Sequence, residues 1–441
     1  MPSRLDKFRI FARDLEEFLW LGFLIAIPLQ TRIILLQPDW YFNEWRSMFL
    51  YATDVLFLLL IILWCIRHGR SMFTPLKTYD WFLILFITAA VFSLAGTTNR
   101  SLSMYALVRL LESILFYWYV RTYVLKRFSV VASAWALVAG GIVQAMIGIG
   151  QFMSQSNLGF SFLGETLLNP NLNGVAVFIN TAGARVMRAY GTTPHPNILA
   201  AYLLVSLGAL YYLFLKNETK IFRLLFPVYG VLLFAFFLTF SRTTIFIWLA
   251  AFCGAMFFTN IKSKKRKLLA GATIIITILF VLFFWQEVWA RLTISSHDEA
   301  VTLRLYYNQQ ALSVGGGHKL NWTGVGVGNF VNWLMEHQPN RPRYLYQPAH
   351  NVFLLVYSEM GILGLMAFFG FLFSLLWSYA RPKIFRDIYS IGPLLLALCF
   401  LGIGLFDHFP WTLQQGRLLF WGVLGYLAGI DPVQEKSPQS D

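Results

Sequence analysis

The sequence predicts an all-α integral membrane protein with about 12 transmembrane helices. Of its 441 residues, 57% are hydrophobic and only 13% are charged. Soluble domains carry about 25% charged residues, so this composition is far from that of a soluble protein. Several apolar runs approach the roughly 20 residues that a helix needs to cross a bilayer. We therefore expect a single polytopic membrane domain over residues 1–441.

The positions of the apolar runs give the expected spans. They lie at residues 18–36, 49–66, 81–97, 104–120, 129–151, 197–215, 222–240, 243–260, 268–287, 351–378, 390–407 and 416–430. The first run is too long for a signal peptide and lacks a small-residue cleavage site. We therefore expect the first run to be a retained span.

The basic residues predict the orientation. Lys and Arg accumulate in the cytoplasmic loops of membrane proteins, and here they are concentrated in alternate short loops. This pattern places the N-terminus in the cytoplasm, and an even number of spans returns the tail at 431–441 to the same side. The net charge of +14 is then explained by topology, so we predict no nucleic-acid partner.

Two long segments are predicted on the outer side. Outer loop one covers residues 152–196 and leads into central helices at 197–287. The large outer loop covers 288–350 and leads into C-terminal helices at 351–430. In the first loop, the alternation around Asn180–Gly183 predicts a β-hairpin. In the second, "SSHDEAVTLRLYYNQQALSV" predicts a helix that is capped by Ser or Asp and stopped by the glycines at 315–317. A second helix is predicted after the turn "GVGVGNF".

Five short stretches share the predicted outer surface of the membrane. They are "RAYGTTPHPN" (188–197), "SRTT" (241–244), "TLRLYY" (302–307), "GVGVGNF" (324–330) and "PAHN" (348–351). The charge pattern that orients the chain does not by itself require these five stretches to lie on one side. Their common placement indicates a functional site there.

Three arginines in these stretches are candidates for binding an anion. They are Arg188, Arg242 and Arg304. Taken singly, each has a simpler explanation: Arg242 as a side chain snorkelling to headgroups, and the other two as surface salt bridges. Taken together beside a histidine, they favour an anion site. A diphosphate is the natural ligand, because the arginine fork matches phosphate oxygens.

His350 is the candidate general base, since histidine is the commonest side chain in that role near neutral pH. The alternative is a hydrogen-bonded or helix-capping residue, and Asn351 would also suit an N-cap. His195 is a secondary candidate, because Pro194 and Pro196 explain its corner as a stiff helix start. The sequence has no H-E-x-x-H, D-x-D or Cys/His cluster, so we predict no metal and no cofactor.

Charged residues also lie within the predicted spans. Arg109 and Glu112 are three residues apart, which predicts a structural ion pair on one helix face. Asp407, in "FDHFPWTLQQGR", is assigned to the outer rim. Asp54 and Glu359 receive no role from sequence.

In "RAYGTTPHPN", "SRTT", "TLRLYY", "GVGVGNF" and "AHNVFLLVYSEMGILGL" the sequence resembles the O-antigen ligases and their relatives, the O-antigen polymerases and bacterial O-oligosaccharyltransferases. The tail "DHFPWTLQQGRLLFW" is also similar to this family. The resemblance implies a GT-C-type glycosyltransferase of the bacterial plasma (inner) membrane. Such an enzyme takes a glycan from undecaprenyl diphosphate at the outer face and needs no metal. Its product belongs to the lipopolysaccharide or other polysaccharide of the cell envelope.

The resemblance also implies residue roles. His350 would deprotonate the acceptor hydroxyl, and Arg188, Arg242 and Arg304 would bind the diphosphate. Arg185 is an alternative to Arg188. The remaining polar residues of these motifs, Asn351, His195 and Asn197, would support the site.

The acceptor is left open as a lipid, a protein or a wall polymer, alongside membrane lipid as a general partner. An O-antigen polymerase, or a flippase for lipid-linked oligosaccharide, is the alternative function. A flippase would place charges along a midplane cavity, often between two similar halves. The arginines gather at one face and no half is duplicated, which favours the enzyme.

Overall fold

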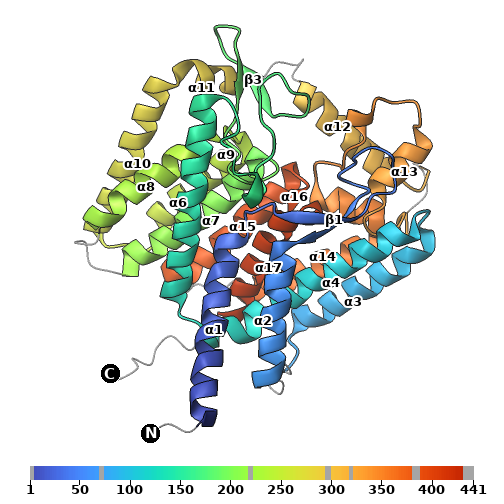
Figure 1. Ribbon diagram of the computed structural model, residues 1–441, viewed down its shortest axis with the longest axis horizontal. Helices are drawn as coiled ribbons and strands as arrows, with labels where there is room; N and C mark the ends of the chain where they lie inside the picture. Colours follow the sequence, from blue (N-terminus) through green and yellow to red (C-terminus); the bar gives the residue numbers. More distant parts are fainter. Residues whose placement is uncertain are drawn as a thin grey trace.

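The computed structural model describes residues 4–68, 74–216, 222–293, 299–316, 321–379 and 388–430. These residues are mostly helical, and the strands are confined to two short antiparallel pairs in this part of the chain (Figure 1). The tail predicted at 431–441 lies outside the described residues.

The first half of the chain contains α1 (Arg4–Ala26), β1 (Arg32–Leu36), β2 (Met48–Tyr51), α2 (Ala52–His68), α3 (Thr78–Ser93), α4 (Arg100–Tyr119), α5 (Leu125–Arg127), α6 (Val130–Ser154), β3 (Val177–Ile179), β4 (Arg185–Met187) and α7 (Pro196–Lys216). The second half contains α8 (Phe222–Leu238), α9 (Arg242–Phe258), α10 (Ser263–Phe283), α11 (Trp285–Leu292), α12 (Glu299–Ser313), α13 (Phe330–His337), α14 (Val352–Tyr379), α15 (Ile388–Phe406), α16 (Phe409–Thr412) and α17 (Gln414–Gly429).

The helices confirm a multi-pass membrane protein. Five described helical segments are long and apolar enough to cross a bilayer, by length and composition: Thr78–Gly96, Val130–Ser154, Pro196–Lys216, Ser263–Phe283 and Val352–Tyr379. Shorter apolar helices cover Leu225–Leu238, Arg242–Phe258 and Ile391–Phe406. The number of crossings and the GT-C architecture stay predictions.

The span expected at 18–36 is wrong in its second half. The helix α1 ends at Ala26, and Arg32–Leu36 forms strand β1, which pairs with β2. Pro28 explains the end of the helix, because proline lacks the N–H of a helical bond and restricts the residue before it. The strand is further fixed by the ion pair between Arg32 and Glu44, with N–O separation 2.5 Å.

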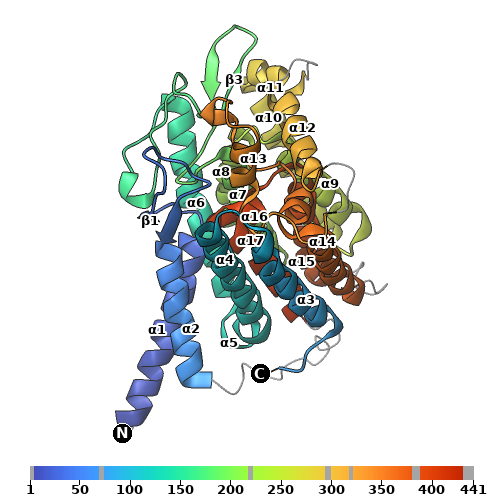
Figure 2. The same ribbon diagram turned by 90° about the vertical axis from the view of Figure 1, so that its right-hand side faces the viewer.

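The core of the molecule lies around α7, of which 78% of the apolar window is buried. Helices α6 and α8 pack along it, and α14 packs against α3. The short helices α11–α13 and the hairpin β3–β4 lie toward the end opposite the start of α1 (Figures 1 and 2). The elements of the two long loops therefore lie toward one end of the molecule.

Both long loops contain the elements expected of them. The hairpin β3–β4 closes over Asn180, whose Oδ1 accepts the backbone N–H of Ala182 and Ala184 at 3.1 and 2.9 Å. The helices α12 and α13 occupy the second loop. The expected N-cap of α12 and the last glycine of its stop lie outside the described residues.

The helix expected over 351–378 is broken at Gly361, which has φ +69° and ψ −170°. Backbone from the preceding loop fills the break: Val325 N–H donates to Ser358 O at 3.0 Å, and Ile362 N–H donates to Asn321 O at 2.8 Å. A Cβ at Gly361 would lie 2.2 Å from Trp322 O, so only glycine fits. The turn "GVGVGNF" also permits a close backbone approach, since a Cβ at Gly324 would meet Glu359 O at 2.1 Å.

Candidate functional site

The site is built on the joint between α14 and α15. Asn351 is the N-cap of α14, because its Oδ1 accepts Leu354 N–H at 3.0 Å. The same side chain donates through Nδ2 to Leu405 O, at 3.1 Å, near the end of α15. This bridge holds His350, just before α14, beside Asp407, just after α15. The structure therefore confirms that Asn351 caps a helix.

His350 faces Asp407 and His408. Its Nδ1 lies 3.8 Å from Asp407 Oδ1 and, although buried, has no hydrogen-bond partner. The same carboxylate oxygen accepts the backbone N–H of His408 at 2.8 Å. The two imidazole rings meet edge to face with centroids 4.9 Å apart, and the ring of Tyr307 lies 6.2 Å from His350. The imidazole thus sits between a carboxylate and aromatic walls.

A chain of hydrogen bonds connects this corner to Arg188. Asn197 Nδ2 donates to Asp407 Oδ2 at 2.6 Å, and Asn197 Oδ1 accepts from Arg188 NH2 at 2.6 Å. Arg188 also donates through Nε to Thr239 O at 2.6 Å. The buried Arg188 guanidinium is therefore held by two partners, and one of them also holds Asp407.

His195 stands at the start of α7. Its Nδ1 accepts the backbone N–H of Asn197 at 3.2 Å, and its carbonyl accepts Ile198 N–H at 3.0 Å. Burial and the positive charge of Arg188 lower the pKa of His195 to about 3. The neutral ring therefore serves the helix start and fixes Asn197.

The other arginines come from α9, α11, α12 and β4. Arg242 begins α9, and its NH1 donates to Arg291 O at 3.5 Å. The Arg291 guanidinium donates to Phe240 O at 3.4 Å. Arg304, on α12, is close enough to affect the pKa of both His350 and Arg188. Arg185, by contrast, is exposed on β4.

The mutual repulsion of these cations is visible in Arg188. Burial lowers its pKa to about 9, and the charges of Arg291 and Arg304 add to that lowering. An anion that binds beside buried like charges lowers the repulsion between them. The arrangement can therefore receive an anionic group.

The same environment decides the protonation of the corner. Burial lowers the pKa of His350, Asp407 partly opposes this, and Arg304 adds to it. Burial alone would raise the pKa of Asp407, but the three neighbouring histidines and Arg304 outweigh burial and lower it. Burial and His350 lower the pKa of His408 to about 3. Near neutral pH a neutral imidazole therefore faces an ionised carboxylate.

His350, Asp407 and His408 also form a group that could hold a metal ion. Their ligand atoms all lie within 4.8 Å of one another, and imidazole with carboxylate is a common donor set for zinc and related ions. The cationic Arg188 and Arg304 nearby oppose a divalent cation. Independence from metal therefore stays a prediction.

Sequence reasoning missed three parts of this site: His408, Arg291 and the carbonyl of Thr239. His408 had a signal, because "FDHF" repeats the pattern of "PAHN", in which polar residues interrupt the end of an apolar run. Arg291 lies in a polar stretch of the second loop without such a pattern. A backbone carbonyl leaves no mark in a sequence.

Residues 227–369 match the model of the family described as O-antigen ligase. This match places residues 227–369 in the O-antigen ligase superfamily. The matched region contains Arg242, Arg304 and His350, while Arg188 and Asp407 lie on either side of it. A comparison with curated proteins found no match. The family match supports a membrane enzyme of the O-antigen ligase or polymerase type.

Proposed function

We propose that this protein is a GT-C-type glycosyltransferase that moves a glycan from undecaprenyl diphosphate to an acceptor hydroxyl. It acts at the outer face of the bacterial plasma membrane, with both termini in the cytoplasm. The observation that carries the proposal is that His350 faces Asp407, which is hydrogen-bonded through Asn197 to Arg188. It joins a candidate base to a cluster of cations that suits a diphosphate.

His350 is the base in this proposal, and Asp407 is its positioning residue. With Nδ1 turned toward the carboxylate, Nε2 is left to accept the proton of the acceptor hydroxyl. The 3.8 Å separation exceeds the roughly 2.6–3.2 Å of a catalytic hydrogen bond, and such contacts commonly shorten when substrate binds. An ionised Asp407 then stabilises the imidazolium that forms, as in other oriented His–carboxylate pairs.

The arginines stabilise the leaving group. The bond from the anomeric carbon to the diphosphate oxygen breaks while the acceptor oxygen bonds to that carbon, so negative charge develops on undecaprenyl diphosphate. Arg188, Arg242 and Arg304 receive this charge, with Arg291 beside them. Cations that are already positioned for a developing charge pay little reorganisation when the reaction occurs. Arg188 meets that condition, since Thr239 O and Asn197 hold it.

A polymerase would use the same donor and site with a second lipid-linked glycan as acceptor. A flippase is less well supported, because the arginines gather at one end of the helices and not along a midplane cavity. The identity of the acceptor distinguishes ligase from polymerase.

The proposal is tested by reconstituted transfer. Wild type, His350→Ala and His337→Ala, an exposed histidine of α13, each receive undecaprenyl-diphosphate glycan with lipid and protein acceptors. We expect His350→Ala to lose about 10²-fold or more of the rate, the size of a general-base contribution, and His337→Ala to match wild type. Equal rates would remove His350 as the base. Movement of the carrier across liposomes without transfer would indicate a flippase.

A further inference from the structure

A pocket adjoins His408 of the candidate site. It has a volume of about 100 Å³ and lies between the β1–β2 connection, α4, α16 and α17. Two of its lining residues also touch His408: the ring of Trp45 meets the imidazole at right angles, 5.2 Å between centroids, and Thr412 Oγ1 lies 2.7 Å from Nδ1. Pro348 of the "PAHN" stretch completes this wall. Two walls of the pocket therefore pack against His408 of the proposed transfer site.

Three buried donors that line the pocket have no hydrogen-bond partner. They are Ser47 Oγ, Arg417 Nε and Trp421 Nε1. A buried polar group without a partner costs about 1–3 kcal/mol, and native structures leave few of them. Three around one pocket indicate a ligand, or water standing in for it, that offers several hydrogen-bond acceptors.

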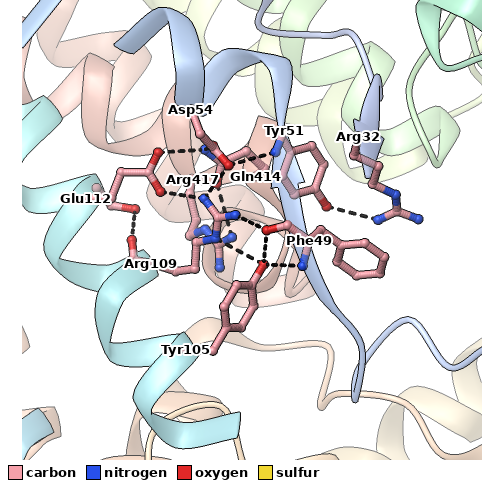
Figure 3. Close-up of polar contacts among 10 residues, drawn as sticks. Arg32, Phe49, Tyr51, Asp54, Tyr105, Arg109, Glu112, Gln414 and Arg417 are labelled. Carbon is pink, nitrogen blue, oxygen red and sulfur yellow. Dashed lines mark hydrogen bonds and ion pairs between the residues drawn. The ribbon is translucent and has the colours of Figure 1, made fainter. Parts of the chain in front are cut away.

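The charges around the pocket argue against an anion. Arg109 pairs with Asp54 and with Glu112, at 2.7 Å each, and Gln414 bridges both carboxylates (Figure 3). Arg32 pairs with Glu44. The remaining cation, Arg417, donates to Gln414 and is attracted by Glu112. Three cations thus stand with three carboxylates, and a fourth carboxylate that lines the pocket, Glu359, accepts a hydrogen bond from Trp411, so no excess positive charge remains.

We propose that this pocket binds a neutral sugar ring, and that the ring belongs to the glycan acceptor. Aromatic walls with a few directed polar groups are typical of small-molecule sites, and Trp45, Tyr105 and Trp411 supply such walls here. When these side chains turn toward the pocket, a sugar offers hydroxyl oxygens to all three donors. About 100 Å³ accommodates several waters, the scale of one sugar ring.

The position of the pocket indicates that its sugar belongs to the acceptor and not to the donor. In Figure 2, α9, which begins at Arg242, and β1 lie on opposite sides of α16. In a direct displacement the attacking hydroxyl and the leaving group occupy opposite faces of the anomeric carbon. With the diphosphate at the arginines, the attacking sugar belongs on the side of β1 and the pocket. This assignment rests on the proposed function, whereas sugar binding itself does not.

Binding is tested without transfer. Saturation-transfer NMR on the full-length protein in detergent would use the methyl glycosides of glucose, galactose and N-acetylglucosamine as probes. Trp421→Phe and Ser47→Ala each remove one free donor and little volume. The matched control is Trp64→Phe, whose buried indole N–H is also unpartnered but lies outside this pocket. We expect at least one glycoside to bind wild type and the control equally, and each pocket variant about five-fold more weakly. No binding to wild type, or equal binding to all four proteins, would overturn the sugar pocket.

Transfer kinetics then test which sugar is bound. We expect the pocket variants to raise KM for the acceptor and to leave KM for the lipid-linked donor unchanged. A rise in donor KM alone would overturn the acceptor assignment. If wild type binds glycosides with the expected variant pattern but transfers no glycan, the proposed function fails while the sugar pocket stands.

Discussion

Nδ1 of His350 lies 3.8 Å from Oδ1 of Asp407, and the two residues are brought together by a third, Asn351. Asn351 caps α14 and at the same time ties its start to the end of α15. The facing of imidazole and carboxylate is therefore a property of the joint between two helices. It does not depend on a flexible side chain finding its partner.

Asp407→Asn should lower kcat, because the carboxamide cannot stabilise the imidazolium or hold Nδ1–H as an ionised acceptor does. We expect a loss of about 10²-fold, within the range contributed by an oriented base, with donor KM little changed. Steady-state transfer kinetics measure both. Asp39→Asn, which disturbs a half-buried pair with Arg46 at 2.8 Å away from His350, is the control. An unchanged kcat in Asp407→Asn would remove Asp407 from the mechanism.

The pH profile of kcat/KM should report the lowered pKa of His350. The base must be deprotonated, and a lowered pKa means that it is already neutral at the ordinary imidazole value of about 6.5. We therefore expect a rate that is flat above about pH 6.5 and falls only at lower pH. Asp407 raises the pKa of His350. In Asp407→Asn the fall of the remaining rate should therefore move to still lower pH. An acid limb above pH 6.5 would contradict this account.

Arg188→Lys should raise KM for the lipid-linked donor. Lysine keeps the charge but cannot contact Thr239 O, Asn197 and a phosphate with one planar fork. Loss of charge-assisted bonds worth about 1.5–3 kcal/mol predicts a rise of roughly 10- to 100-fold. Arg185→Lys, on the exposed strand β4, should leave KM unchanged. The opposite pattern would assign the diphosphate contact to Arg185.

Transfer should be insensitive to EDTA but inhibited by added Zn²⁺. His350, Asp407 and His408 can ligate an ion, and a bound ion would engage the imidazole and the carboxylate on which the proposed proton transfer depends. EDTA should restore the rate of the zinc-treated enzyme. Loss of activity on EDTA treatment, followed by recovery with one divalent ion, would show that the enzyme depends on metal.

Arg109→Met should destabilise the protein without touching the proposed base. The substitution leaves Asp54 and Glu112 facing each other in a buried setting, and removal of one partner from a buried pair costs about 3–5 kcal/mol. Thermal unfolding in detergent should show a clearly lower Tm than for wild type. Arg100→Met, an exposed arginine at the start of the same helix, should keep the wild-type Tm. Equal Tm values would show that the network contributes no stability.

Periodicity and length predicted the helices well because an apolar run in a membrane protein has few alternatives to a helix. They failed where one residue decides the backbone, at Pro28 and at Gly361. The candidate site was predicted in part for a similar reason. Motifs with local signals, such as those of Arg188 and His350, could be found along the chain. Pairings across the fold could not: Asp54 gains its partner Arg109, and Glu359 its partner Trp411, only through tertiary packing.

The break at Gly361 separates the segment that follows His350 from the rest of α14. The upper segment is held by the loop at 321–326, because Val325 N–H donates to Ser358 O and Asn321 Nδ2 donates to Tyr357 O. The lower segment begins at Ile362 and packs against α3, and the two helices can tilt together when the hydrocarbon thickness changes. We expect the break to absorb such tilting, so that the imidazole keeps its height above the lipid in thick and thin bilayers alike. Gly361 would thus make the position of His350 independent of the thickness of the bilayer.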